Sequence, residues 1–137
     1  PVRTFEEQLA IDIDLIDAFI EENNIQDVQN DPSGIRYVVI EEGTGLVPEV
    51  NWIVKVDYVG NLLTDPNGTP FDQQQGIEFI LSQLIVCWQI MLTQFGEGTT
   101  LELYIPSGYA YGFAGRPGSI PSNANLIFDI TLVSARK

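Results

Sequence analysis

The chain has 137 residues with 19 acidic and 6 basic side chains, so its formal net charge is −13. This length suits one domain, and a hydrophobic content of 45% can supply a core for it. The negative charge argues against nucleic-acid binding, because a phosphate backbone would be repelled. No apolar run approaches the ~20 residues that a membrane-spanning helix needs, so no membrane span is expected.

Two absences narrow the possible chemistry further. The chain contains no histidine, which excludes Ser-His and Cys-His nucleophiles and every histidine-based metal site. Its single cysteine, Cys87, cannot form an intrachain disulfide or a thiolate cluster. We therefore expect no metal and no cofactor, and any catalysis must proceed without imidazole.

Residues 1–33 are predicted to form an acidic helical extension. Thr4 and Glu7 have the spacing of a capping box, which places the helix start at Phe5. Asn23-Asn24 can end the helix, since asparagine tolerates the left-handed conformation. An apolar stripe recurs at helical spacing along it: Phe5, Leu9, Ile13, Ile16 and Ile20. Ile11 and Leu15 lie opposite that stripe, so the helix either packs only on its own domain or also contacts a second copy or a partner.

A dense turn cluster at 30–34 marks the boundary, and residues 34–137 are expected to form the second unit. Apolar residues then alternate as in strands. Strands are predicted at 35–40, 52–59, 77–81, 101–105 and 126–132, with a helix over 84–95. The predicted fold class is α+β, with an antiparallel sheet wrapping one short helix and an N-terminal helix ahead of it.

Candidate sites for chemistry are few. The glycine-rich loop 108–118 lacks the Lys-Ser/Thr end of a phosphate-binding loop. Asp57, Asp72 and Asp129 could pair or bind a metal through oxygen, but their spacing follows strand alternation and favours solvated or capping roles. Many aromatic residues lie next to turns, where they either fill the core or line an apolar pocket.

Five sequence blocks, in order, resemble the FKBP-type peptidyl-prolyl cis-trans isomerases. They are Val56-Asp57-Tyr58-Val59-Gly60, Pro70-Phe71-Asp72, Leu84-Ile85-Val86-Cys87-Trp88, the segment 105–121 with Pro106-Ser107-Gly108-Tyr109-Ala110-Tyr111-Gly112, and the segment 125–132. The resemblance covers residues 34–136 and implies a five- to six-stranded antiparallel sheet half-wrapped around one short helix. It also implies catalysis of rotation about X-Pro bonds in polypeptides, which assists protein folding.

The resemblance also implies a set of site residues. Trp88 would be the floor of the pocket, while Tyr111 and the backbone N–H of Ile85 would donate hydrogen bonds to a substrate carbonyl. Asp72 would be the polar group near the twisting amide. The remaining residues implied at the walls and rim are Tyr58, Phe71, Phe79, Phe128, Leu84, Ile120, Ile77 and Phe113. Proline-containing polypeptides would be substrates, and macrolides such as rapamycin are further candidate ligands.

The chain departs from the family pattern at several places. Cys87 stands where the family has glycine before the tryptophan, and the links around residues 72–77 and 81–88 are short. These departures leave a second interpretation, a catalytically weak FKBP-like module that binds proteins or acts as a chaperone. The acidic helical arm resembles those of bacterial envelope isomerases. We therefore predict a periplasmic location, with a lipid anchor before truncation as one option and the cytoplasm as the alternative.

Overall fold

A computed structural model describes residues 2–137 as one sheet with two α-helices. The six strands pair only in antiparallel fashion, in the order β1-β2-β5-β6-β3-β4. The strands are β1 (Gln29–Asn30), β2 (Arg36–Glu41), β3 (Ile53–Leu62), β4 (Asp72–Ile80), β5 (Thr100–Ile105) and β6 (Leu126–Arg136). The helices are α1 (Phe5–Glu22), α2 (Val86–Leu92) and two 3₁₀ turns, η1 (Leu81–Gln83) and η2 (Ser107–Tyr109). The predicted α+β class, with its six-stranded sheet and N-terminal helix, is confirmed.

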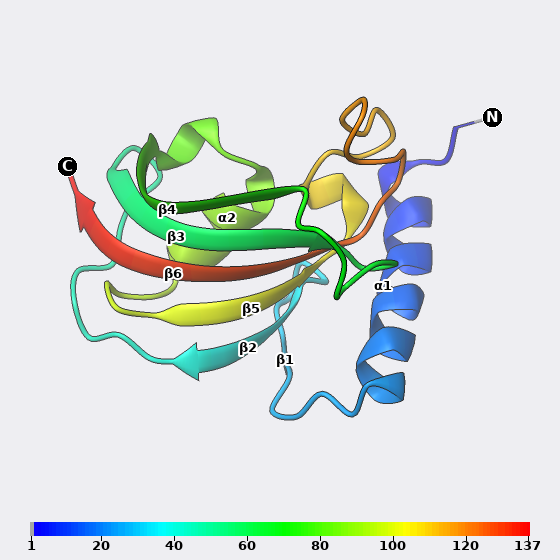
Figure 1. Ribbon diagram of the computed structural model, residues 1–137, viewed down its shortest axis with the longest axis horizontal. Coiled ribbons are helices and arrows are strands. Elements are labelled where there is room, and N and C mark those ends of the chain that lie inside the picture. The colour runs from blue at the N-terminus through cyan, green and yellow to red at the C-terminus, as the bar shows by residue number, and fades with distance from the viewer. Residues whose placement is uncertain (1) are drawn as a thin grey trace.

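The core lies between α2 and the concave face of the sheet (Figure 1). Strand β3 alternates buried and half-buried residues, and its inward side chains include Val54, Val56 and Tyr58. From the other side, α2 contributes Trp88 and Met91, which are 4% and 0% exposed. Helix and sheet therefore bury one continuous apolar cluster, which is what holds α2 in place.

Helix α1 stands at one end of the sheet and runs across the strands (Figure 1). It starts as predicted, because the Thr4 hydroxyl accepts from the Glu7 N–H while the Glu7 carboxylate accepts from the Thr4 N–H. Ile16 is fully buried against Leu63 and Tyr104, so the helix packs on its own domain.

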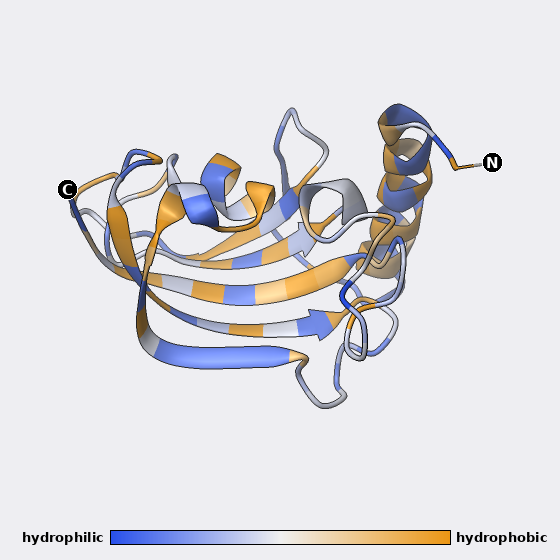
Figure 2. Cartoon of the chain, turned by 90° about the horizontal axis from the view of Figure 1, so that it is seen from above, coloured by the Kyte–Doolittle hydropathy of each residue, from blue (hydrophilic) through white to orange (hydrophobic). Residues whose placement is uncertain are grey.

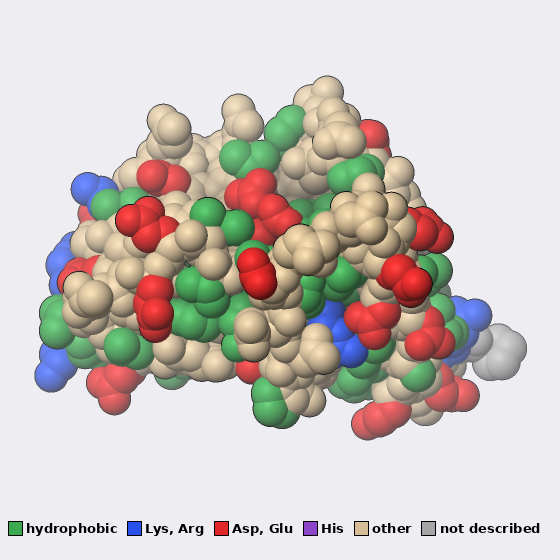
Figure 3. Space-filling view, turned by 90° about the horizontal axis from the view of Figure 1, so that it is seen from below, with side chains coloured by type: hydrophobic (Ala, Val, Ile, Leu, Met, Phe, Trp, Pro, Cys, Tyr) green, Lys and Arg blue, Asp and Glu red, His purple; other side chains and the backbone are tan. Residues whose placement is uncertain are grey.

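The far side of α1 is open to solvent. Ile11 and Leu15 remain 37% and 54% exposed there. On the opposite stripe Ile16 is fully buried, although Phe5 at its start is still 46% exposed. Acidic side chains gather over α1 at the right of the space-filling view (Figure 3). Among residues 2–137 no helix is both long enough and apolar enough to cross a membrane.

Several element bounds differ from the sequence prediction, and β3 and β6 run on to Leu62 and Arg136 instead of ending at 59 and 132. Strand β4 begins at Asp72 rather than at 77. The prediction missed its first half because this part of the strand is a polar sheet edge (Figure 2), where Gln73, Gln74 and Gln75 show no apolar alternation. Helix α2 is shorter than 84–95: Thr93 caps it, and its hydroxyl donates to the Gln89 carbonyl. Strand β1, only two residues long, falls where the sequence indicated turns.

Candidate functional site

A cavity of about 310 Å³ opens between the first turn of α2 and the concave face of the sheet. Its lining combines aromatic rings, two aliphatic side chains and a few polar groups. The lining residues are Tyr58, Asp72, Phe79, Gln83, Leu84, Ile85, Trp88, Tyr111 and Phe128. All six residues predicted to be catalytic are therefore brought to one cavity by β3, β4, β6, α2 and the loop after η2.

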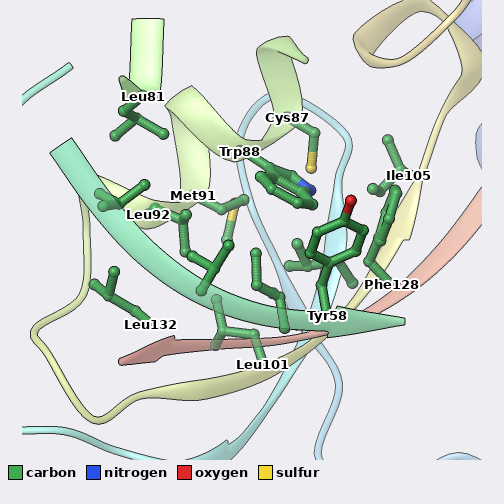
Figure 4. Close-up of a cluster of buried hydrophobic side chains, with 14 of the residues drawn as sticks. Tyr58, Leu81, Cys87, Trp88, Met91, Leu92, Leu101, Ile105, Phe128 and Leu132 are labelled. Atoms are coloured by element: carbon green, nitrogen blue, oxygen red, sulfur yellow. The ribbon is translucent and has the colours of Figure 1, made fainter. Parts of the chain in front are cut away.

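Trp88 lies at the bottom of this cavity, in the first turn of α2. The backbone N–H of Trp88 donates to the carbonyl of Ile85, the residue that caps the helix. The indole packs edge-on against Tyr58 and Phe128, with ring centroids 4.9 and 5.3 Å away (Figure 4). Among residues 2–137 its buried Nε1–H finds no acceptor. The floor is thus a rigid aromatic surface without an outward polar group.

The polar centre of the cavity is a Tyr58–Asp72 pair. Antiparallel pairing sets Asp72 opposite Gly60, so its carboxylate reaches the inward Tyr58 on the neighbouring strand. The Tyr58 hydroxyl donates to Oδ2 of Asp72 over 2.7 Å. Burial, and then the hydrogen bond to this carboxylate, raise the pKa of Tyr58 well above its ordinary value. Tyr58 is therefore a neutral donor at any physiological pH.

Gly60 leaves room for two aromatic rings, that of Phe128 at the cavity wall and that of Phe71 behind it. A Cβ atom on Gly60 would lie 2.6 Å from both Phe128 and Phe71, whose ring centroids are 5.5 Å apart. In the sequence, Gly60 stood out only as the last residue of the Val56–Gly60 motif. The structure shows that a side chain at this position would push apart the rings behind the site.

Gly60→Ala is accordingly expected to lower the free energy of unfolding by about 1–3 kcal/mol, the usual range for overpacking. Because Phe128 would shift into the cavity, ligand affinity should fall as well. Urea denaturation followed by circular dichroism measures the first effect. Gly76→Ala is not a matched control, since Gly76 has a φ of +64°. Ala18→Val, on the exposed side of α1, tests an added side-chain group without such a clash.

Tyr111 enters the cavity from the loop that follows η2. The Ser107 carbonyl accepts from the N–H groups of Ala110 and Gly112, the two neighbours of Tyr111. The Tyr111 carbonyl in turn accepts from Gly115 over 3.0 Å. These bonds fold the loop into consecutive tight turns, which fixes the direction from which the Tyr111 ring approaches the site.

The segment before Trp88 supplies the main-chain donor. Among residues 2–137 no backbone oxygen accepts from the Ile85 N–H, so it is free to bind a ligand carbonyl. Cys87 is fully buried in the core, and this burial raises the pKa of its thiol. The Cys87 side chain, which stands in place of the family's glycine, thus packs in the core and adds no reactive group to the cavity.

Not every predicted binding residue lines the cavity. Phe71 packs behind Phe128, and Ile120 is buried in the core at 4% exposure. Ile77 is half-buried on β4 against the core. Phe113 is 60% exposed and lines a separate hollow beside α1. Gln83 lines the cavity, and sequence reasoning missed it because a polar residue in a short link carries no periodic signal.

The other two candidate aspartates lie on the far side of the sheet. A hollow of about 550 Å³ there is lined by Asp57 and Asp129, among mainly Gln and Thr side chains. Asp57 accepts from the Gly76 N–H over 2.7 Å, which is a capping role. Within residues 2–137 no group of three or more Asp, Glu, Cys or His side chains is placed to hold a metal ion.

Asp129 carries a pH-dependent cost to stability. It lies opposite Glu102 in the β5–β6 pairing, and partial desolvation followed by the Glu102 charge raise the pKa of Asp129 from 3.8 to about 6. A carboxyl that binds its proton more tightly when folded stabilises the fold fully below its ordinary pKa. This contribution is lost as the pH rises through 6.

Asp129→Asn should therefore stabilise the protein at pH 8, by about 1 kcal/mol once solvent screening of this exposed group is allowed for, or roughly 3 °C in Tm. At pH 4.5 the gain should shrink, because the wild-type carboxyl is then mostly protonated. Thermal melts at the two pH values measure this. Glu42→Gln removes one exposed charge elsewhere, and an equal gain in that variant would assign the effect to net charge alone.

Comparison with known proteins agrees with this geometry. The model of the family described as FKBP-type peptidyl-prolyl cis-trans isomerase matches residues 47–133. The peptidyl-prolyl cis-trans isomerase Mip of Coxiella burnetii is 38% identical over 125 residues, covering 88% of this chain and 53% of that protein. FkpA of Aeromonas hydrophila is 40% identical over 114 residues, covering 80% of this chain and 41% of that protein. The chain thus spans about half the length of the curated relatives it matches.

A solved structure extends the similarity to α1. The crystal structure of a peptidyl-prolyl cis-trans isomerase from Pseudomonas syringae superposes with a TM-score of 0.82 at 30% identity, covering 100% of this chain and 99% of that one. These relatives point to the same family as the sequence motifs, the fold and the aromatic cavity. The chain belongs to the FKBP-type peptidyl-prolyl cis-trans isomerase family.

Proposed function

We propose that this chain catalyses cis-trans rotation about X-Pro bonds in polypeptides. The observation that carries the proposal is the apolar aromatic cavity that surrounds one hydrogen-bonded Tyr58–Asp72 pair and two further donors. Rotation about an amide meets a barrier of roughly 18–20 kcal/mol because the C–N bond has partial double-bond character. No bond is broken, so neither a nucleophile nor a metal is needed.

The cavity would lower that barrier by favouring the twisted amide over the planar one. The planar amide is more charge-separated and better hydrated, so transfer from water onto the Trp88 floor penalises it more. The Tyr111 hydroxyl and the Ile85 N–H would hold the carbonyl oxygens on either side of the rotating bond. Asp72 would act by its charge, which raises the energy of a planar amide whose oxygen is strongly negative.

Residues 34–137 form the isomerase domain in this proposal, and residues 1–33 form the helical extension. The same cavity would accept macrolides such as rapamycin, because an apolar site with a few converging donors suits such ligands. We also propose that the exposed Ile11 and Leu15 side chains of α1 contact a second copy of the chain. Ile11→Glu should then shift the molar mass in solution from dimer to monomer in light scattering.

We propose the bacterial cell envelope as the location. The relative from Legionella longbeachae, 37% identical over 110 residues, carries the name outer membrane protein MIP. That name supports an envelope role for this chain. Attachment by a lipid anchor stays a prediction, which fractionation of cells and fatty-acid labelling of the native protein would test.

A protease-coupled or NMR exchange assay on short X-Pro peptides, with and without rapamycin, tests the proposed activity. Catalysis that rapamycin abolishes would support both the activity and the cavity as its site. Catalysis that rapamycin leaves unchanged would support the activity and contradict macrolide binding. A well-folded sample without catalysis would contradict the activity and favour the protein-binding module instead.

A further inference from the structure

A buried carboxylate links the N-terminal helix to the loop that carries Tyr111. Asp12 of α1 is 1% exposed, although an acidic residue on a surface helix normally faces water. Its Oδ2 accepts from the N–H of Ser107 over 3.0 Å and from the Ser107 hydroxyl over 2.6 Å. Its Oδ1 accepts from Gln8 over 2.9 Å. These hydrogen bonds offset the cost of burying the charge.

Ser107 is the point from which the loop is folded. It is fully buried, and its N–H also meets the side-chain oxygen of Asn125 at 3.1 Å. Its carbonyl accepts from Ala110 and Gly112, as described above, so one residue fixes both neighbours of Tyr111. A shift of Ser107 would therefore move the Tyr111 side chain at the cavity.

The same helix and its following link hold η2 from two other directions. Phe5 packs edge-on against Tyr109 with ring centroids 5.4 Å apart, and it fills the space that a side chain at Gly108 would need. The Tyr109 hydroxyl donates to the Ser33 carbonyl over 2.5 Å. Three residues of the predicted extension 1–33, namely Phe5, Asp12 and Ser33, thus contact η2, which belongs to the predicted second unit.

We propose that Asp12 is a positioning residue of the isomerase site, which acts through Ser107 to place the Tyr111 hydroxyl. This inference rests on the proposed function. It makes α1 a working part of the site although the helix does not line the cavity. The family motifs do not contain Asp12, and the sequence pattern sets it off the apolar stripe, so the role comes from the contacts alone.

A double-mutant cycle tests this inference. Asp12→Asn keeps the shape but removes the charge, and it should lower kcat/KM about fivefold at 10 °C, with folding of the variant verified by circular dichroism. In a Tyr111→Phe background the same change should cost less than about 1.5-fold, because the hydroxyl that it positions is gone. Asp14→Asn, an exposed change on the same helix, is the matched control and should leave kcat/KM unchanged.

Equal losses in both backgrounds, or no loss from Asp12→Asn, would overturn the inference. Ser107→Ala, which removes only the hydroxyl contact, keeps the test open if Asp12→Asn does not fold, and it should show the same dependence on Tyr111. Amide NMR shifts of Tyr111 and Gly112 give a second measurement. If the wild type is inactive, the proposed function fails, and the NMR shifts then decide the inference. Shifts of the Tyr111 and Gly112 signals in Asp12→Asn but not in Asp14→Asn would support it, and unchanged signals in Asp12→Asn would overturn it.

Discussion

Trp88→Ala is expected to lower the free energy of unfolding by about 3–5 kcal/mol and to remove most catalysis. The indole is 4% exposed and contacts the rings of Tyr58, Phe79 and Phe128, so its loss opens a large void under the cavity. Trp88→Phe should cost no more than about 1 kcal/mol, since it also removes a buried N–H that lacks an acceptor among residues 2–137. Urea denaturation followed by circular dichroism distinguishes the two variants.

The difference in the free energy of unfolding between Trp88→Ala and Trp88→Phe shows what the indole contributes. A loss from Trp88→Phe as large as that from Trp88→Ala would mean that the indole nitrogen is needed for stability. Val86→Ala serves as the control, because this side chain lies on the same helix and is 49% exposed. It should change the free energy of unfolding by only a few tenths of a kcal/mol.

Asp72→Leu is expected to lower kcat/KM at least tenfold, which corresponds to about 1.4 kcal/mol of transition-state stabilisation. The variant removes both the charge near the twisting amide and the acceptor that holds the Tyr58 hydroxyl at 2.7 Å. The fold should persist, because Asp72 is the half-buried first residue of an edge strand. The protease-coupled assay measures the loss, and a thermal melt verifies folding.

Asp72→Asn separates the two contributions. An asparagine oxygen still accepts from Tyr58, so a loss as large as that of the leucine variant would assign the effect to the charge. Retained activity in Asp72→Asn would contradict a role for the charge and leave ring orientation as the cause. Gln73→Leu, on the neighbouring exposed position, adds the same side chain without touching the cavity and should leave kcat/KM unchanged.

Local rules predicted most of the fold. The Thr4–Glu7 capping box and the Asn23 end gave α1 correctly, because both depend on neighbouring residues. The first half of β4 escaped prediction, since an edge strand of glutamines obtains its hydrogen bonds from β3 and not from any apolar pattern of its own. The helix prediction ran to Phe95 because this side chain packs on Tyr37 and so keeps the apolar spacing beyond the helix.

The cavity was predictable only through the family resemblance. Alternation placed Tyr58 and Phe128 on inward faces, but it could not tell a ring that lines a cavity from one that fills the core. Phe71 and Ile120 took the second role, and Phe113 faces solvent. Asp12 is not among the residues of the predicted apolar stripe, and no spacing rule could show that Ser107, 95 residues later, donates hydrogen bonds to its carboxylate.

That separation also has a kinetic consequence. Asp12 and Ser107 lie 95 residues apart, and Ile16 rests on Tyr104, so α1 cannot dock before β5 and η2 exist. An 18-residue helix without tertiary contacts is only marginally stable in water. During synthesis the apolar side chains of α1 therefore stay exposed to solvent until the chain has been made as far as η2. We therefore expect its docking to come late in folding, so that loosening its anchors should speed unfolding while leaving refolding rates nearly unchanged.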